Sequence, residues 1–91
     1  MSVRVRIPLT LRRLTSEQEV IEVQAATVAA AVEAMHARYN GIRDRIMDKT
    51  GHVRGSVLVF VNDEDIRFLQ NEQTPLKDGD EISIVPAFAG G

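Results

Sequence analysis

Hydrophobic and polar residues alternate at the start of the chain. Every second residue from Val3 to Leu9 is aliphatic, and two arginines and a proline lie between them. This two-residue period predicts a β-strand with one buried face. Residues 12–18 are polar and predict a turn, so Glu19 to Val23 predicts the second strand of a hairpin. Ser16 and Glu19 have the spacing of a helix capping box, but the β-branched residues that follow disfavour a helix there.

The segment from Thr27 to Tyr39 has the period of an amphipathic helix. Thr27 is suited to cap its first turn, and Gly41 is suited to end it. Alanines within the segment favour a helix and allow it to pack closely on a sheet. The residues that fall on one face at a 3.6-residue period are Val28, Ala31, Val32, Met35 and Tyr39.

Shorter elements are predicted after this helix. Ile42 and the pair Ile46–Met47 predict a short helical turn that packs on the core. Residues 48–55 are rich in polar residues and glycine and predict a mobile loop. The continuous apolar run from Val57 to Val61 predicts a strand that is covered on at least one face.

The last third of the chain predicts two turns and a final strand. Asn62 to Asp65 predicts a turn, and Ile66 to Leu69 predicts a brief extended piece. Thr74 to Asp80 has strong turn chemistry, with an Asp-Gly pair at its centre. Glu81 to Val85 predicts the final strand, which Pro86 ends.

The order of these elements predicts an α+β fold. A hairpin, one main helix and two later strands form a mixed sheet of four to five strands packed on that helix. Because the helix crosses over between the hairpin and the later strands, the first and last strands are expected to lie side by side and parallel. That arrangement is the β-grasp, or ubiquitin-like, roll. We expect one domain over residues 1–86 and a flexible tail over residues 87–91.

Composition and charge exclude several classes of function. The 91 residues include 11 Lys and Arg against 13 Asp and Glu, for a net charge of −2. A nucleic-acid-binding protein usually has a basic excess, so no nucleic acid partner is expected. The chain has no cysteine, which excludes disulfides and thiolate chemistry. No apolar run is long enough for a membrane helix and no signal peptide is evident, so we expect no membrane partner and a cytoplasmic location.

The polar residues do not form a recognisable catalytic or metal-binding motif. His36 and His52 have no cysteine or histidine at ligand spacing, so no metal site is expected. No glycine-rich phosphate loop or serine nucleophile motif is present. Asp63, Glu64 and Asp65 form an acidic cluster, which is read either as a solvated turn or as a docking point for a basic partner surface.

The end of the sequence offers a different kind of reactive group. Ala89, Gly90 and Gly91 follow the last strand. Two terminal glycines are either a frayed end or the working part of the protein. Glycine has no Cβ, so an extended tail can enter a narrow channel. A carboxylate is a poor electrophile, so its use would require activation, for example as an acyl-adenylate.

Three segments resemble the ubiquitin-like sulfur carrier proteins. They are VNDEDIRFL (Val61 to Leu69), TPLKDGDEISIVP (Thr74 to Pro86) and the closing Ala-Gly-Gly. The family includes the small subunit of molybdopterin synthase, the carrier of the thiamine pathway and the carrier of cysteine biosynthesis. Residues 40–55 and the Asn-Asp-Glu-Asp-Ile-Arg-Phe stretch look most like the cysteine carrier. The end of the chain departs from the Pro-Pro-Val-[Ser/Ala]-Gly-Gly pattern of molybdopterin-synthase subunits.

The resemblance implies a carrier that has no catalytic residues and binds no cofactor of its own. A ubiquitin-activating-type enzyme would use ATP to adenylate Gly91, and a sulfur donor would convert it to a thiocarboxylate. The acceptor would be an enzyme of the cysteine synthase type, with a zinc protease releasing cysteine, or the large subunit of molybdopterin synthase. Ala89 and Gly90 are small, so they would allow the tail to thread into the active sites of these enzymes.

Partner contacts are expected at apolar and acidic residues. The predicted contact residues are Phe88, Phe68, Asp63, Glu64 and Asp65. Phe60 is a further apolar candidate, although a core position is the stronger reading for it. Three other functions remain open: a molybdopterin synthase subunit, a protein modifier joined to lysines, and a β-grasp binding module whose Gly-Gly end has no role.

Overall fold

Five strands and one main helix form the structure, a computed structural model that describes residues 1–87. The strands are β1 (Ser2–Arg6), β2 (Val20–Gln24), β3 (Val57–Val61), β4 (Glu64–Asp65) and β5 (Glu81–Pro86). The α-helices are α1 (Val28–Arg38) and α2 (Ile42–Ile46), and the 3₁₀ helices are η1 (Leu9–Thr15), η2 (Ile66–Phe68) and η3 (Asn71–Gln73).

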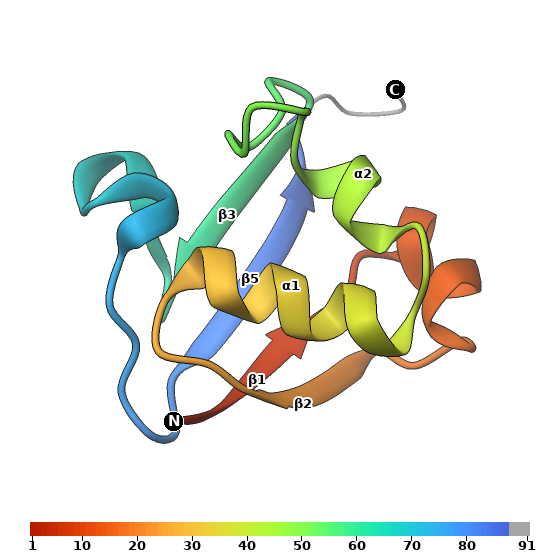
Figure 1. Cartoon of the computed structure of the whole chain (residues 1–91), viewed down its shortest axis with the longest axis horizontal. Helices are drawn as coiled ribbons and strands as arrows, with labels where there is room; N and C mark the ends of the chain where they lie inside the picture. The colour runs from red at the N-terminus through yellow and green to blue at the C-terminus, as the bar shows by residue number, and fades with distance from the viewer. Residues whose placement is uncertain (88–91) are drawn as a thin grey trace.

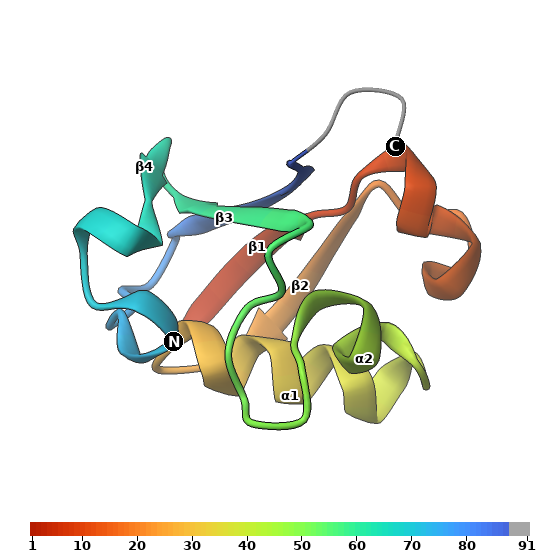
Figure 2. The ribbon, with the colours of Figure 1, turned by 90° about the horizontal axis from the view of Figure 1, so that it is seen from above.

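The strands form one mixed sheet in the order β2-β1-β5-β3-β4. β1 pairs antiparallel with β2 and parallel with β5, and β5 pairs antiparallel with β3. Helix α1 crosses one face of this sheet, and α2 follows it on the same side (Figures 1 and 2). The sequence therefore predicted the β-grasp roll and its parallel first and last strands correctly. The final strand lies at the centre of the sheet.

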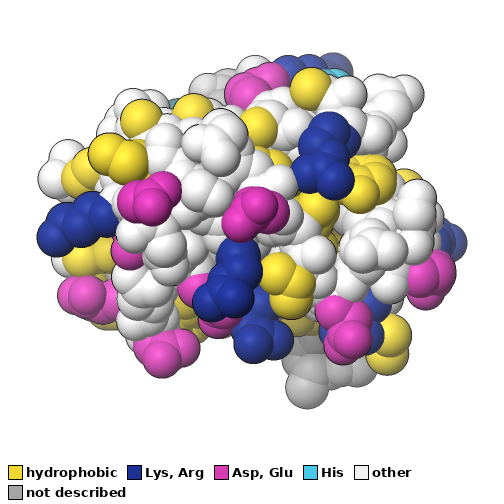
Figure 3. Space-filling model, turned by 90° about the horizontal axis from the view of Figure 1, so that it is seen from below, with side chains coloured by type: hydrophobic (Ala, Val, Ile, Leu, Met, Phe, Trp, Pro, Cys, Tyr) yellow, Lys and Arg dark blue, Asp and Glu magenta, His cyan; other side chains and the backbone are white. Residues whose placement is uncertain are grey.

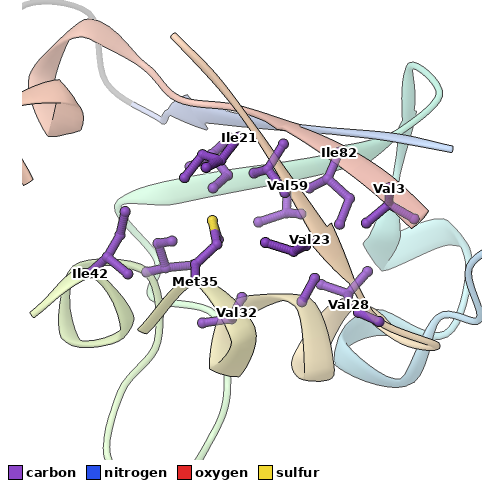
Figure 4. Packing of buried hydrophobic residues seen from close by; sticks show 14 of the residues in the cluster. Val3, Ile21, Val23, Val28, Val32, Met35, Ile42, Val59 and Ile82 are labelled. Carbon is purple, nitrogen blue, oxygen red and sulfur yellow. The ribbon is translucent and has the colours of Figure 1, made fainter. Parts of the chain in front are cut away.

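The core lies between the sheet and α1. Alternate residues of β1, β2, β3 and β5 point toward the helix, where they meet Val28, Val32 and Met35 (Figure 4). Ile42 and Ile46 of α2 are fully buried at the end of this core. Each such aliphatic side chain contributes about 1.5–3 kcal/mol by leaving water. The predicted helical turn that packs on the core is thereby confirmed.

Helix α1 begins where the sequence predicts. The Thr27 hydroxyl oxygen accepts a hydrogen bond from the backbone N–H of Ala30 across 3.1 Å, which satisfies one free donor of the first turn. Gly41 lies three residues beyond the end of α1, with φ of +95°. A residue with a Cβ would be strained there, so this glycine allows the chain to turn from α1 into α2.

Some predicted segments differ in the structure. The alternation that predicts a strand through Leu9 extends beyond the strand itself, because β1 ends at Arg6 and Leu9 is the exposed first residue of η1. Residues 12–15 of the turn predicted at residues 12–18 belong instead to the 3₁₀ helix η1, in which Leu11 and Thr15 are both buried. The extended piece predicted at Ile66–Leu69 is instead the helix η2. The side chain of Asp65 accepts the backbone N–H of Arg67 and caps that turn, so the extended backbone of β4 ends at Asp65.

Candidate functional site

The root of the predicted tail lies at the rim of the sheet. The backbone N–H of Ala87 donates to the carbonyl oxygen of Ser56 across 3.0 Å, next to the pair formed by Pro86 and Val57. The tail residues that the sequence singles out, Phe88, Ala89, Gly90 and Gly91, lie outside the described residues. The domain boundary predicted after residue 86 remains a prediction.

Strand β5 gives the tail a rigid base. Its start, Glu81 to Ser83, pairs with β1, its residues from Ile82 to Pro86 pair with β3, and its inward residues Ile82 and Ile84 are buried. The register of a strand with one buried face is strongly specified, because a shift by one residue would turn its apolar side chains toward solvent. The position at which the chain leaves the domain is therefore fixed by the core.

The face of the sheet opposite α1 carries apolar side chains near this root. Val85 is opposite Leu58 in the β3–β5 pairing, and Phe60 is opposite Ser83. Val85 is 38% exposed, while Leu58 and Phe60 are half-buried. Phe60 is outside the buried cluster, so the core position favoured from sequence is wrong. Residues 1–87 leave this face uncovered and available for contact with another protein.

Charged residues share this uncovered face with the apolar ones. Arg6 Nε lies 3.0 Å from Glu81 Oε1, and Arg4 is opposite Glu22 in the β1–β2 pairing. On the side of the molecule seen in Figure 3, acidic and basic side chains are likewise interspersed and do not form one large patch of a single sign. Contact through these faces would depend on the placing of individual charges more than on net charge.

The structure divides the predicted acidic cluster. Asp63 and Glu64 are exposed in the turn between β3 and β4, whereas Asp65 is only 9% exposed and faces Arg67. Arg67 Nη2 lies 2.8 Å from Asp65 Oδ2. The hydrogen bonds of the Arg67 side chain and then of its backbone N–H hold the pKa of Asp65 below its usual value. Asp65 thus stabilises the turn into η2, and it does not lie with Asp63 and Glu64 on an exposed surface.

Two acidic turns that are far apart in sequence meet at one end of the sheet. Asn62 Nδ2 donates to Asp80 Oδ1 across 2.8 Å, and the backbone N–H of Glu81 donates to Asn62 Oδ1 across 3.0 Å. Phe68 follows in η2 and is 80% exposed. Because Glu81 begins β5 and the tail follows its other end, the acidic end and the tail root lie at opposite ends of that strand.

The loop residues 48–52 form a local hydrogen-bond network. Asp48 Oδ1 accepts from the backbone N–H of Thr50 and of His52, and from the Thr50 hydroxyl at 2.6 Å. The hydroxyl bond is the main reason that the pKa of Asp48 is lowered. Thr50 Oγ1 also lies 2.8 Å from His52 Nδ1. Within residues 1–87, no group of three or more histidine or acidic side chains is placed to hold a metal ion.

A cavity of about 420 Å³ lies beside β3. Two of its acidic side chains are engaged in local contacts: Asp65 pairs with Arg67, and Glu72 accepts the backbone N–H of Val53 across 2.7 Å. These contacts stabilise the loops around the cavity. The sequence pattern did not predict it, because its walls come from three segments that only the fold brings together.

Comparison with known proteins identifies the family. The ThiS family model matches residues 5–91, so the chain belongs to the ThiS family. Among curated proteins, the sulfur carrier protein CysO of Mycobacterium tuberculosis is 40% identical over the whole of both chains. The family resemblance read from the sequence is thereby confirmed.

Two further relatives extend this comparison. A chain in the crystal structure of the Amycolatopsis orientalis BexX/CysO complex superimposes with a TM-score of 0.92 at 37% identity, covering 98% of this chain and 99% of that one. Small archaeal modifier protein 3 of Haloferax volcanii is 35% identical over 66 residues, which are 72% of this chain and 71% of that protein.

In the described part of the chain, no helix is long and apolar enough to cross a membrane.

Proposed function

We propose that this protein is a sulfur carrier whose reactive group is the carboxylate of Gly91. The observation that carries the proposal is the full-length similarity to CysO, together with a family match that extends through residue 91. The structure supports it because the last strand is the central strand of the sheet and brings Ala87 to the rim. The chemistry would be performed by partner enzymes.

The first step would be activation of the tail by an adenylating enzyme of the ubiquitin-activating type. A carboxylate oxygen of Gly91 attacks the α-phosphate of ATP, which forms the acyl-adenylate and releases pyrophosphate. Hydrosulfide then attacks the acyl carbon, the new C–S bond replaces the bond to AMP, and a thiocarboxylate remains. A persulfide donor would instead form an acyl disulfide, and an additional thiol would cleave it to the thiocarboxylate while being oxidised to a disulfide with the donor thiol. ATP is a substrate of the partner enzyme in this scheme.

Glycine at both final positions suits this chemistry. A tail without Cβ atoms can be held extended in a narrow channel while backbone groups of the enzyme approach it closely. Ala89 has the smallest side chain after glycine, so it adds little width to the extended tail. Phe88 would be the last large side chain before the channel, so it would contact the rim of the enzyme.

We further propose that the acceptor belongs to cysteine biosynthesis. The name CysO on the full-length relatives supports this branch. A cysteine synthase-type enzyme would join the thiocarboxylate to an amino-acid skeleton, and a zinc protease would release cysteine. The uncovered sheet face and the exposed residues Phe68, Asp63 and Glu64 are the surfaces that these enzymes would contact.

Intact-protein mass spectrometry tests the carrier function. The chain is incubated with ATP, sulfide and the adenylating enzyme of the same organism. The expected result is a mass gain equal to replacement of one oxygen by one sulfur, located in the C-terminal peptide. A variant with one alanine added after Gly91 is the matched control and should remain unchanged. A gain of the same size in that variant, or no gain in the wild-type chain, would refute the proposal.

The pathway is tested by its products. Cysteine and molybdopterin formation are assayed separately with the thiocarboxylated chain and the corresponding acceptor enzymes. Cysteine alone is expected, and molybdopterin alone would show that the chain is a molybdopterin synthase subunit.

A protein modifier is the second candidate, favoured by the similarity to small archaeal modifier protein 3. In that case the activated Gly91 would form an isopeptide bond with a lysine of another protein. Immunoblots of an epitope-tagged chain would show a ladder of conjugates that disappears when Gly90 and Gly91 are deleted. A tagged chain that runs as one band under all conditions would exclude this role.

A further inference from the structure

The end of β5 borders a notch that no sequence pattern predicts. The notch has a volume of about 210 Å³ and lies between η1, α2, the start of β3 and the end of β5. Its walls are mostly apolar and include Leu11, Val57, Ile84, Val85 and Pro86. In Figure 2 the red start of η1 and α2 lie on the right of the molecule, and the dark blue end of β5 lies nearer its middle.

One unpaired cation stands at this notch. Arg45 is exposed on α2, and its side chain makes no hydrogen bond or ion pair within residues 1–87. The neighbouring arginines differ: Arg43 pairs with Glu33 across 3.0 Å, and Arg54 Nε donates to the carbonyl oxygen of Asp44 across 2.7 Å. Arg45 is therefore available to a carboxylate from another molecule.

The notch and the tail share the same root. Val85 and Pro86 line the notch, and Ala87, the next residue, is hydrogen-bonded to Ser56, which also lines it. Four residues follow Ala87, and an extended chain of that length spans roughly 13 Å. An enzyme that holds the end of this tail in its active site must therefore come close to the rim of the domain.

We propose that this notch is the docking point for the adenylating enzyme that takes up the tail. An apolar side chain of the enzyme enters the notch, and a neighbouring carboxylate of the enzyme pairs with Arg45. Apolar walls beside Arg45, which has no partner among residues 1–87, are complementary to that combination of groups. The inference rests on the proposed function. It adds a contact surface on the folded domain, separate from the tail, by which the enzyme recognises the carrier.

Steady-state kinetics with two matched charge reversals test the inference. Pyrophosphate release by the adenylating enzyme of the same organism is measured against the concentration of the full chain. R45E places a negative charge at the notch, and K77E makes the same change in the turn before β5, at the opposite end of the strand. R45E is expected to raise KM about tenfold or more at unchanged kcat, because it removes binding and leaves the tail chemistry intact.

Two further variants separate the charge from the apolar walls. R45K keeps the cation and should restore most of the affinity, while K77E should change KM less than about twofold. T10W adds a large side chain at an exposed residue of the notch wall, and it should raise KM as R45E does. Circular dichroism spectra that superimpose on the wild-type spectrum would show that these surface variants are folded.

Three outcomes would overturn the inference. Equal KM values for wild type, R45E and T10W would reject the docking point while leaving the proposed function intact. No carrier-dependent pyrophosphate release with the wild-type chain would reject both. If deletion of residues 88–91 shifts the methyl signals of Val57 and Ile84 in spectra of the free protein, the notch holds the chain's own tail and the proposed occupant is wrong.

Discussion

Arg67 folds back on Asp65, two residues before it, and donates to that carboxylate from both its side chain and its backbone. The Nη2–Oδ2 distance is 2.8 Å, and the backbone N–H lies 2.9 Å from Oδ1. One carboxylate therefore caps η2 and fixes an arginine at the acidic end of the sheet. Although Asp65 lies in a run of three acidic residues, its role differs from that of the other two.

This contact predicts a pH dependence of stability. The pKa of Asp65 is lower in the folded chain than in the unfolded chain, where an aspartate has a value of about 3.9. The ionised carboxylate thus stabilises the fold above that value, and the stabilisation is lost as pH falls toward the lower folded pKa. In D65N, the loss of stability between neutral and acidic pH should be smaller than in wild type.

Urea unfolding at pH 7 and near pH 3 measures this difference. The control is D63N, because the Asp63 side chain makes no hydrogen bond or ion pair with the described residues and it is exposed. D63N should retain the wild-type pH dependence. Identical pH dependence in D65N and wild type would show that the Asp65–Arg67 contact does not contribute.

A second prediction concerns the start of α1. T27A removes the hydroxyl that accepts the Ala30 N–H, and it should lower the free energy of unfolding by about 1 kcal/mol. T27S keeps a hydroxyl at the same position and should lose much less. The midpoint of urea unfolding should fall in T27A with an unchanged m value. Equal midpoints for T27A and T27S would contradict the capping role.

The regular elements could be predicted from sequence because each is specified by its own residues. The alternation from Val3 to Ile7 and the helical period from Val28 to Met35 indicate which face of each element is buried. This periodicity of apolar residues is the main signal of secondary structure in a sequence. The cap at Thr27 and the β-branched run of β3 were clear for the same reason. From these elements the topology followed, since few folds accommodate a hairpin, a helix and two strands.

The short helix η2, the exposure of single side chains and the position of the notch could not be predicted in this way. η2 depends on one capping contact made by Asp65, which looks in sequence like any member of an acidic run. Phe60 lies within an apolar run, and only the pairing of β3 with β5 decides that it faces away from α1. The notch at Arg45 is formed by four separate segments, so no local pattern contains it.

The buried position of Ile46 predicts that α2 contributes strongly to stability. I46A removes most of a fully buried side chain and should lower the free energy of unfolding by about 2–5 kcal/mol, whereas I46V should cost about 0.5–1.5 kcal/mol. V20A, at a residue of β2 that is 37% exposed, is the matched control and should cost less than I46A. Thermal unfolding of the three variants measures the order. A loss in V20A as large as that in I46A would show that α2 is not part of the cooperative core.

The last prediction separates folding from partner contact at Phe68. This side chain is 80% exposed at the end of η2, so F68S should change the free energy of unfolding by no more than about 0.5 kcal/mol. If Phe68 contacts a partner, F68S should nevertheless weaken one of the two partner reactions, adenylation of the tail or transfer of sulfur to the acceptor enzyme. V20S is a suitable control because Val20 is an exposed apolar residue of β2, at the opposite edge of the sheet from β4, and does not line the notch at Arg45. Kinetic constants for both reactions are measured with wild type, F68S and V20S. F68S should raise KM for one of the two partners and leave the other unchanged, because an enzyme that docks at the tail root need not also reach the acidic end. Unchanged constants for both reactions would exclude Phe68 as a contact residue for these partners.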